Sequence, residues 1–254
     1  MLPRRILGQT DIQVSALGLG TVKFGRNQGV KYPHHFELPS DQQINELLNQ
    51  AQELGINVLD TAPAYGQSET RLGQLIRNRH DWVIIDKVGE QFNAGHSSFD
   101  FSPEAMRQSL ENSLRLLKTD YIDILLLHSD GRDMELIDEG CLETLAHFQE
   151  EGKIRSYGLS GKSLEGALAC LKQSDVAMVT YHPHYRDEEK ALDYAAKHQK
   201  SCLIKKALAS GHIHSIEQAQ EHLRFCYQHP GCSSIVVGTL NPEHLKQNAA
   251  AFLS

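Results

Sequence analysis

Short runs rich in β-branched residues and leucine alternate with longer segments of helical periodicity along this chain of 254 residues. Such alternation is typical of parallel strands joined by helical crossovers. We expect eight strands, over residues 15–21, 57–62, 82–88, 121–128, 154–161, 176–182, 201–208 and 233–239. Eight strand–helix units in about 250 residues are the size of a closed (β/α)8 barrel, whereas an open doubly wound sheet needs fewer strands or more chain. The sequence therefore predicts an α/β protein with a (β/α)8 TIM barrel.

Turn and cap signals complete the predicted architecture. Two short alternating runs flank the turn-forming residues 8–11, which predicts an N-terminal β-hairpin placed to plug the N-terminal face of the barrel. Ser102 and Asn241 are good N-cap residues, and each is followed by a proline at the first helical position. The sequence contains no linker, no low-complexity tract and no repeat beyond the alternation, so we expect residues 1–254 to form a single domain.

Composition excludes several classes of partner. The formal net charge of -7 and the pI near 6.0 leave no basic stripe for nucleic acid or for an anionic membrane. No segment approaches 18 uninterrupted apolar residues, and the N-terminus has no apolar signal region, so we expect a cytoplasmic protein. The five cysteines include no C-x-x-C pair, which predicts reduced structural thiols. The 14 histidines form no H-x-x-x-H or E-x-x-H pattern, and we expect no metal site.

Polar residues stand at the ends of three consecutive predicted strands. Asp60 ends the second strand, Tyr65 follows in the next loop, Lys87 is near the end of the third strand and His128 ends the fourth. Each one alone has an ordinary structural explanation, as a turn cap, a rim tyrosine, a surface lysine or a core histidine. Chemistry in such barrels takes place at the C-terminal ends of the strands, so their convergence on one mouth favours a catalytic site.

The chemistry of these four side chains is compatible. Tyrosine is a poor proton donor at neutral pH, but a nearby ammonium stabilises the phenolate and lowers the pKa of a phenol. Lys87 can supply that ammonium, a buried Asp60 can hold it by ion pairing, and a neutral His128 can orient a carbonyl oxygen. Such a site polarises a C=O group and delivers a proton as negative charge develops on oxygen. Because no side chain supplies a hydride, reduction of the carbonyl needs a nicotinamide cofactor.

At these residues the chain resembles the aldo-keto reductase superfamily, and the resemblance covers essentially the whole sequence. The matching segments, in order, are LDTAPAYGQSE, IIDKVG, YIDILLLH, GKIRSYGLSG and GTLNPEHLKQN. The resemblance implies that Tyr65 is the general acid, that Lys87 and Asp60 tune it, and that His128 orients the substrate. It also implies an NAD(P)H-dependent oxidoreductase that reduces aldehydes or ketones to alcohols.

The cofactor side of the resemblance is less complete. Many members hold the nicotinamide carboxamide with a Ser-Asn pair after the fifth strand and a Gln on the sixth, whereas this chain has Ser160-Gly161 and Met178. Lys205 stands where many members stack an aromatic ring, and either Lys205 or Lys206 could meet phosphate or remain solvated. The residues that the resemblance assigns to cofactor binding are Thr21, Ser160, Lys205, Lys206, Gly238, Thr239, Leu240, His244 and Asn248.

The closing motif sets the expectation for nucleotide recognition. Gly238, Thr239 and Leu240 would face phosphate at the start of the last helix, where free N–H groups favour anions, and Asn248 could reach the adenine. The Lys and Arg with which relatives often grip a 2'-phosphate are replaced here by Gly238 and His244. We therefore expect NADP as the cofactor, with NAD also possible.

The substrate is expected to be a small carbonyl compound, and the protein is expected to be a monomer. The segment after the first strand carries Phe24, Tyr32 and Phe36, which we expect to form one wall of the pocket. Because the chain ends within the last predicted helix, we expect the pocket to be open.

Two other functions remain as alternatives. The first is a non-catalytic nucleotide-binding barrel that acts as a redox sensor or interaction subunit, which the departures at the carboxamide and stacking positions favour. The second is an enzyme in which Lys87 or Lys205 forms a Schiff base with a carbonyl substrate.

Overall fold

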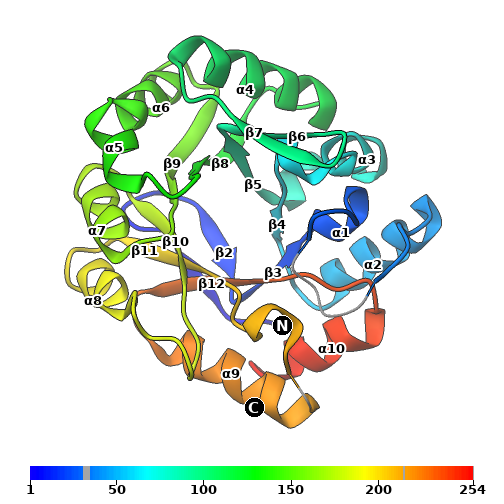
Figure 1. Ribbon diagram of the computed structural model, residues 1–254. Coiled ribbons are helices and arrows are strands. Elements are labelled where there is room, and N and C mark those ends of the chain that lie inside the picture. Colours follow the sequence, from blue (N-terminus) through cyan, green and yellow to red (C-terminus); the bar gives the residue numbers. More distant parts are fainter. Residues whose placement is uncertain (31–34, 214, 254) are drawn as a thin grey trace.

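Eight parallel strands close into a barrel at the centre of the molecule, and helices form a ring around it (Figure 1). The computed structural model describes residues 1–30, 35–213 and 215–253. In this part of the chain the barrel strands are β3 (Leu17–Gly20), β4 (Val58–Asp60), β5 (Val83–Val88), β8 (Ile122–His128), β9 (Ile154–Ser160), β10 (Val176–Thr180), β11 (Ser201–Lys205) and β12 (Cys232–Val237). Neighbouring strands follow the chain order, and β12 pairs with β3 to close the barrel. The predicted (β/α)8 barrel is confirmed.

The outer ring consists of the helices that connect the strands. Within the described ranges the α-helices are α1 (Val22–Gly25), α2 (Asp41–Glu53), α3 (Ser68–Leu75), α4 (Pro103–Leu117), α5 (Asp133–Asp138), α6 (Cys141–Glu150), α7 (Leu164–Gln173), α8 (Glu189–Lys197), α9 (Ile216–Gln228) and α10 (Pro242–Ala250), and the 3-10 helices are η1 (Pro63–Tyr65), η2 (Arg79–Asp81) and η3 (Ala209–Gly211). Ser102 and Asn241 accept the capping hydrogen bonds of α4 and α10, as predicted. No helix in these ranges is long and apolar enough to cross a membrane.

The main apolar core lies between the barrel strands and the surrounding helices. All five cysteines are buried and free within it, which agrees with the predicted structural thiols. Phe24 is also completely buried in this core, so the prediction that it lines the pocket is wrong. Phe24 belongs to α1, and its apolar ring gains more from packing into this core than from facing a polar cleft.

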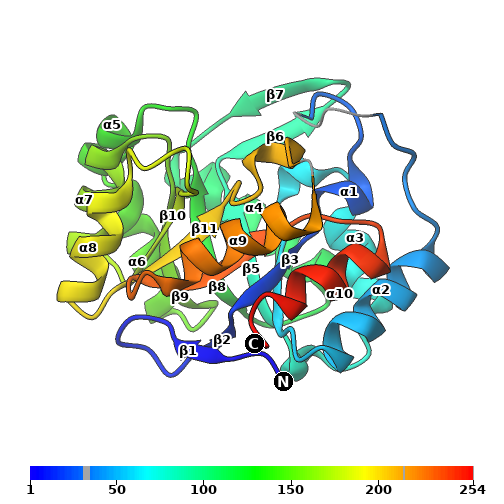
Figure 2. The same ribbon diagram turned by 90° about the horizontal axis from the view of Figure 1, so that it is seen from below.

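A hairpin covers the N-terminal end of the barrel (Figure 2). Its strands are β1 (Arg4–Ile6) and β2 (Gln13–Ser15). Leu7, Ile12 and Val14 of this hairpin pack in one buried cluster with residues that point into the barrel. The predicted N-terminal hairpin is confirmed, and it plugs the end of the barrel that lies away from the C-terminal strand ends.

A second hairpin stands over the opposite end of the barrel (Figure 2). Its strands are β6 (Glu90–Asn93) and β7 (His96–Phe99), and the turn between them uses positive φ angles at Ala94 and Gly95. The sequence analysis predicted no strands here. This hairpin begins directly after β5, so it carries its first residue, Glu90, to the C-terminal rim of the barrel.

Candidate active site

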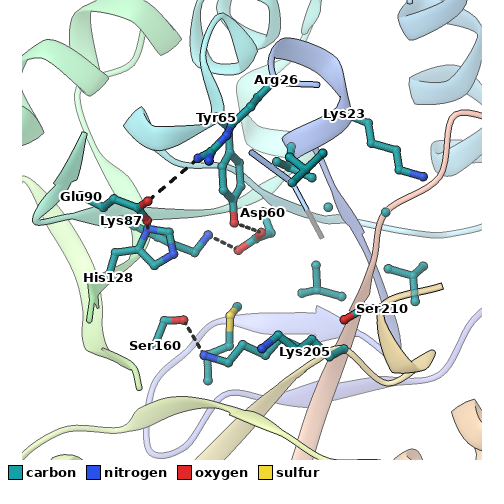
Figure 3. Close-up of a pocket in the computed structure, with 18 of the residues that line it drawn as sticks. Lys23, Arg26, Asp60, Tyr65, Lys87, Glu90, His128, Ser160, Lys205 and Ser210 are labelled. Carbon is teal, nitrogen blue, oxygen red and sulfur yellow. Dashed lines mark hydrogen bonds and ion pairs between the residues drawn. The ribbon is translucent and has the colours of Figure 1, made fainter. Parts of the chain in front are cut away.

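A cleft of about 460 Å³ opens at the C-terminal ends of the barrel strands (Figure 3). Asp60, His128 and Lys205 are the last residues of β4, β8 and β11, and Lys87 is the last but one of β5. Because the parallel strands of a barrel end at one rim, residues far apart in sequence meet there. The four predicted catalytic residues, Asp60, Tyr65, Lys87 and His128, all line this cleft.

Lys87 and Asp60 form a buried ion pair. Lys87 Nζ lies 2.5 Å from Asp60 Oδ1 and donates a second hydrogen bond, of 2.7 Å, to the carbonyl oxygen of Thr61. The residue Lys87 is 1% exposed and Asp60 is 5% exposed. An isolated charge at this depth costs several kcal/mol, so each ion depends on the other for its burial.

Tyr65 lies next to this ion pair. It is the last residue of η1, which follows β4 after two residues, and its hydroxyl donates a hydrogen bond of 3.5 Å to Asp60 Oδ2. Lys87 Nζ lies 4.8 Å from the centre of the Tyr65 ring. One carboxylate therefore contacts both the ammonium and the phenol, and it holds them together at the same side of the cleft.

The turn that carries Tyr65 is fixed by close backbone packing. Gly66 follows with φ at 63°, and a Cβ added there would lie 2.2 Å from the carbonyl oxygen of Gly25. Since that distance is below any real contact, the approach of α1 to this turn requires glycine. Arg26, just after α1, donates a hydrogen bond of 3.0 Å to the carbonyl oxygen of Ala64. These contacts hold η1, and with it Tyr65, against the rim.

His128 meets a carboxylate that the sequence analysis did not identify. Its Nδ1 lies 2.9 Å from Oε2 of Glu90, the first residue of the β6–β7 hairpin. Ser97 donates a hydrogen bond of 2.6 Å to the other carboxylate oxygen, and Arg26 Nη1 lies 3.9 Å from it. The His128 ring stands edge-on to the Tyr65 ring, with their centres 6.3 Å apart. The hairpin thus adds a positioned carboxylate to the barrel mouth.

The Glu90 contact affects the protonation of both side chains. Burial lowers the pKa of His128, while the hydrogen bond and charge of Glu90 act in the opposite direction. Burial alone would raise the pKa of Glu90, but the contacts with His128, Ser97 and Arg26 together outweigh it and lower that pKa to about 2. Because Glu90 is therefore ionised, we infer that the imidazole keeps a proton on Nδ1. A neutral His128 then has an acceptor at Nε2, and only the imidazolium has a donor there.

Lys205 lies on another wall of the cleft (Figure 3). Its Nζ donates hydrogen bonds of 3.1 Å to Ser160 Oγ and 2.6 Å to the carbonyl oxygen of Gly161. Burial lowers the pKa of Lys205 to about 8, although the carboxylate of Glu188 acts to raise it. Met178 lines the same cleft. The three departures from the family pattern, at Gly161, Met178 and Lys205, thus lie together.

Some of the predicted cofactor residues line the cleft and the others do not. Ser160, Lys205, Lys206 and Gly238 line the cleft. Thr21 is buried, and its hydroxyl contacts the Asp60 carbonyl oxygen at 2.8 Å instead of facing the cleft. The predicted residues beyond Gly238 do not line the cleft: Thr239 and Leu240 lie between β12 and α10, and His244 and Asn248 belong to α10.

The segment after β3 lines the cleft with residues other than the predicted aromatics. Val22, Lys23 and Arg26 line it, whereas Phe36 does not and Tyr32 lies outside the described residues. Arg26 and Glu90 are the functional candidates that sequence reasoning missed. The Asn93-Ala94-Gly95 turn between two short alternating runs was a hairpin signal that could have located Glu90.

The positively charged side chains that line the cleft fit an anionic nucleotide. Besides the paired Lys87, the basic residues that line it are Lys23, Arg26, Lys162, Lys205 and Lys206, against the carboxylates of Asp60 and Glu90. This local excess of positive charge occurs in a chain of net charge -7 and favours a phosphate-bearing ligand. The N-terminus of α10, which follows Gly238 closely, adds free N–H groups. Within the described residues, no group of three or more His, Cys, Asp or Glu could hold a metal ion.

Comparisons with known proteins identify the family of this barrel. The model of the aldo/keto reductase family matches residues 16–221. A Pseudomonas aeruginosa protein assigned to the aldo-keto reductases has a crystal structure with a TM-score of 0.89 and 49% identity, over 98% of this chain and 93% of that one. An aldo/keto reductase from Klebsiella pneumoniae, solved with NADP and acetate, has a TM-score of 0.73 and 28% identity, over 99% of this chain and 90% of its own.

Among curated proteins, the oxidoreductase YqkF of Bacillus subtilis, which is uncharacterised, is 30% identical over 87% of this chain and 70% of its own length. The alignments with two further curated relatives cover 49% and 62% of those proteins, so this chain spans only part of their length.

Proposed function

Because this chain belongs to the aldo/keto reductase family, we propose that it reduces aldehydes or ketones to alcohols with NADPH, or with NADH, as the hydride donor. The observation that carries the proposal is the pair of contacts made by Asp60. One of its carboxylate oxygens lies 2.5 Å from Lys87 Nζ, and the other accepts a hydrogen bond from Tyr65. This arrangement places an ammonium beside a phenol in a cleft, as general acid catalysis by tyrosine requires.

In the proposed mechanism, Tyr65 is the proton donor. The substrate carbonyl oxygen accepts a hydrogen bond from the Tyr65 hydroxyl, and the phenol transfers its proton as negative charge develops on that oxygen. The Lys87 ammonium stabilises the phenolate that forms, and Asp60 keeps the ammonium in place. The bound cofactor supplies the hydride, which no side chain can provide.

His128 and Glu90 orient the substrate oxygen in this proposal. The carboxylate of Glu90 keeps the proton on Nδ1, so Nε2 donates to a carbonyl oxygen only when the ring is an imidazolium. The neutral ring that the sequence analysis expected would instead accept a hydrogen bond from a hydroxyl, such as that of the alcohol product. Glu90 is then a positioning residue, because its charge favours protonation of His128 whereas burial opposes that protonation.

The residues proposed to hold the cofactor are those at the edge of the cleft. Ser160 and Lys205 lie near the catalytic side chains, and Lys206 and Gly238 line the cleft towards α10. No basic side chain stands at the Gly238 position, and the exposed His244 replaces an arginine of many relatives, so we propose that NADPH is preferred over NADH only modestly.

Two observations favour other functions, which the experiment must therefore distinguish from carbonyl reduction. Gly161 and Met178 offer no side-chain amide for a nicotinamide, which favours a nucleotide sensor without turnover. The lowered pKa of Lys205, about 8, makes it a candidate for Schiff-base chemistry, because a neutral amine is the nucleophile.

One set of measurements separates these functions. NADPH and NADH are titrated into the protein by fluorescence, and oxidation of each is then followed with a panel of aldehydes and ketones. The proposal expects binding and turnover, whereas a sensor binds without turnover. Borohydride trapping of a carbonyl compound on Lys205 or Lys87 would support the Schiff-base enzyme instead.

A further inference from the structure

Lys205 carries a charge that the proposed mechanism does not use. It ends β11, and its Nζ is held by Ser160 Oγ and by the carbonyl oxygen of Gly161, both at the end of β9. Two of its three N–H groups are therefore engaged, and the ammonium faces the cleft across from Tyr65 and Asp60 (Figure 3). Ser160 is paired in register with His128, so the ammonium is close to the proposed reaction centre.

In the described part of the chain no carboxylate contacts Lys205, in contrast to Lys87, although the Glu188 carboxylate acts on Lys205 from further away. Lys87 has the carboxylate of Asp60 at 2.5 Å, whereas Lys205 enters none of the ion pairs found in the described part of the chain. Both of its hydrogen-bond acceptors are uncharged oxygens. A partly buried ammonium without a contacting anion acts on other charges in the same cleft through a medium of low effective dielectric constant.

A nicotinamide cofactor changes the charge of its ring when it gives up a hydride. The oxidised ring carries one positive charge and the reduced ring is neutral, while the phosphates of the two forms are identical. We propose that the Lys205 ammonium makes the cleft bind the reduced cofactor more tightly than the oxidised one. This inference rests on the proposed function, because it requires a nicotinamide nucleotide in the cleft. Two unit charges within about 10 Å at an effective dielectric constant of about 20 predict a preference of roughly tenfold or more.

This preference would have a consequence for turnover. After hydride transfer the ring becomes positively charged and is repelled by Lys205, so the spent cofactor leaves more readily than the fresh cofactor. The substitution of an aromatic ring by lysine at this position then serves carbonyl reduction and is compatible with catalysis. It opposes the reverse reaction, for which the oxidised form must bind.

The effect should depend on pH, because burial lowers the pKa of Lys205 to about 8. Below this pKa the ammonium is present and discriminates between the two forms, and above it the neutral amine does not. The groups that act on Lys205 come from several elements, and they are Glu188 before α8, Asp133 of α5, Lys206 after β11, Lys87 of β5 and His128 of β8. Burial lowers the pKa of His128, so this ring loses its proton at a lower pH than Lys205 does.

The test measures the dissociation constants of NADPH and NADP⁺ for the same protein by titration at equilibrium. Each constant is measured at two pH values, one about one unit below the pKa of Lys205 and the other about two units above it. The ratio of the two constants isolates the charge of the ring, since the phosphates contribute equally to both. In the wild type we expect NADP⁺ to bind at least tenfold more weakly than NADPH at the lower pH, and this ratio to fall at the higher pH.

Two variants of Lys205 make the test specific. Lys205→Met keeps the length of the side chain without the charge, and we expect its ratio to be small and the same at both pH values. Lys205→Arg keeps the charge throughout, so we expect its ratio to stay high at both. Lys206→Gln removes a neighbouring charge proposed to meet phosphate, and it should weaken both forms in parallel. Lys197→Gln, exposed at the end of α8, controls for net charge.

The outcomes distinguish the inference from the function on which it rests. If both forms bind but Lys205→Met has the same ratio and pH dependence as the wild type, the inference is wrong and the proposed function stands. If neither form binds the wild type at any pH, the proposed function fails and the inference fails with it.

Discussion

Glu90 Oε2 lies 2.9 Å from Nδ1 of His128, and it reaches this position from a hairpin that is not part of the barrel. Without this hairpin, Nδ1 of His128 would be buried and would have no carboxylate beside it. The hairpin therefore determines which tautomer and which charge of His128 the cleft can use.

The first prediction concerns this contact. Glu90→Gln keeps the size of the side chain but removes the charge that raises the pKa of His128. We expect carbonyl reduction to fall by roughly tenfold near neutral pH and its decline with rising pH to begin at a lower pH than in the wild type. The measurement is kcat/KM over a range of pH, with the exposed Glu53→Gln as control. A uniform loss without a shift of the profile would mean that Glu90 has a structural role alone.

The second prediction concerns the Asp60–Lys87 ion pair. Lys87→Met leaves the carboxylate of Asp60 buried without its partner, so we expect the free energy of unfolding to fall by about 3–5 kcal/mol. Asp60→Asn combined with Lys87→Met removes both charges and should recover part of this loss. Urea unfolding of the single and double variants measures the effect. A double variant less stable than Lys87→Met would contradict it, and none of these variants should reduce carbonyls at the wild-type rate.

The third prediction concerns a pair of buried acids behind the site. Glu69 of α3 and Asp86 of β5 are 2% and 0% exposed, and burial raises the pKa of Glu69 to about 8 and that of Asp86 to about 6. Folded Glu69 keeps its proton up to about pH 8, whereas the unfolded chain loses it near 4.5. Stability should therefore fall as pH rises between these values, by up to about 1.4 kcal/mol per pH unit.

Glu69→Gln cannot ionise at this position and should remove its share of the dependence, leaving the share of Asp86 below about pH 6. The measurement is the free energy of unfolding of the wild type and of the variant at several pH values between about 4.5 and 8. A wild type whose stability is constant or rises across this window would show that Glu69 is ionised in the folded state.

The fourth prediction concerns the choice of cofactor. We expect NADPH to bind more tightly than NADH in the wild type, but only modestly, because the 2'-phosphate lacks a basic partner. His244→Arg in the first turn of α10 should strengthen NADPH binding by roughly tenfold or more, since a charge-assisted hydrogen bond contributes about 1.5 to 3 kcal/mol. NADH serves as the internal control and should be unaffected. Equal or reversed affinities in the wild type would contradict the proposal.

The barrel was predictable because the alternation of strands and helices is a local pattern. All eight predicted strands are present, but several end earlier than predicted. The strand expected over 201–208 ends at Lys205, since Lys206 adopts a positive φ of 58° and leaves the ladder. The composition LIKKAL gives no sign of this change, because lysine and leucine are compatible with either conformation.

That Asp60, Tyr65, Lys87 and His128 line one cleft was predictable because strand ends meet at one rim, but their partners were not. The contact between Glu90 and His128 joins a hairpin to a strand, and Lys205 contacts Ser160 across 45 residues of sequence. Such pairings depend on the register of distant strands and on where a loop folds back. No local periodicity contains that information.

The central claim is that Tyr65 donates the proton. Tyr65→Phe keeps the ring and removes only the hydroxyl that contacts Asp60, so the fold and the binding of NADPH should survive. Tyr194→Phe, on α8, is the matched control and should behave as the wild type.

The most direct measurement compares the rate of aldehyde reduction by the wild type and by Tyr65→Phe, both saturated with NADPH. We expect the variant to bind NADPH with unchanged affinity and to be slower by the contribution of a general acid, on the order of 10² to 10⁴. If Tyr65→Phe reduces aldehydes as fast as the wild type, the proton comes from another group and the central claim is wrong.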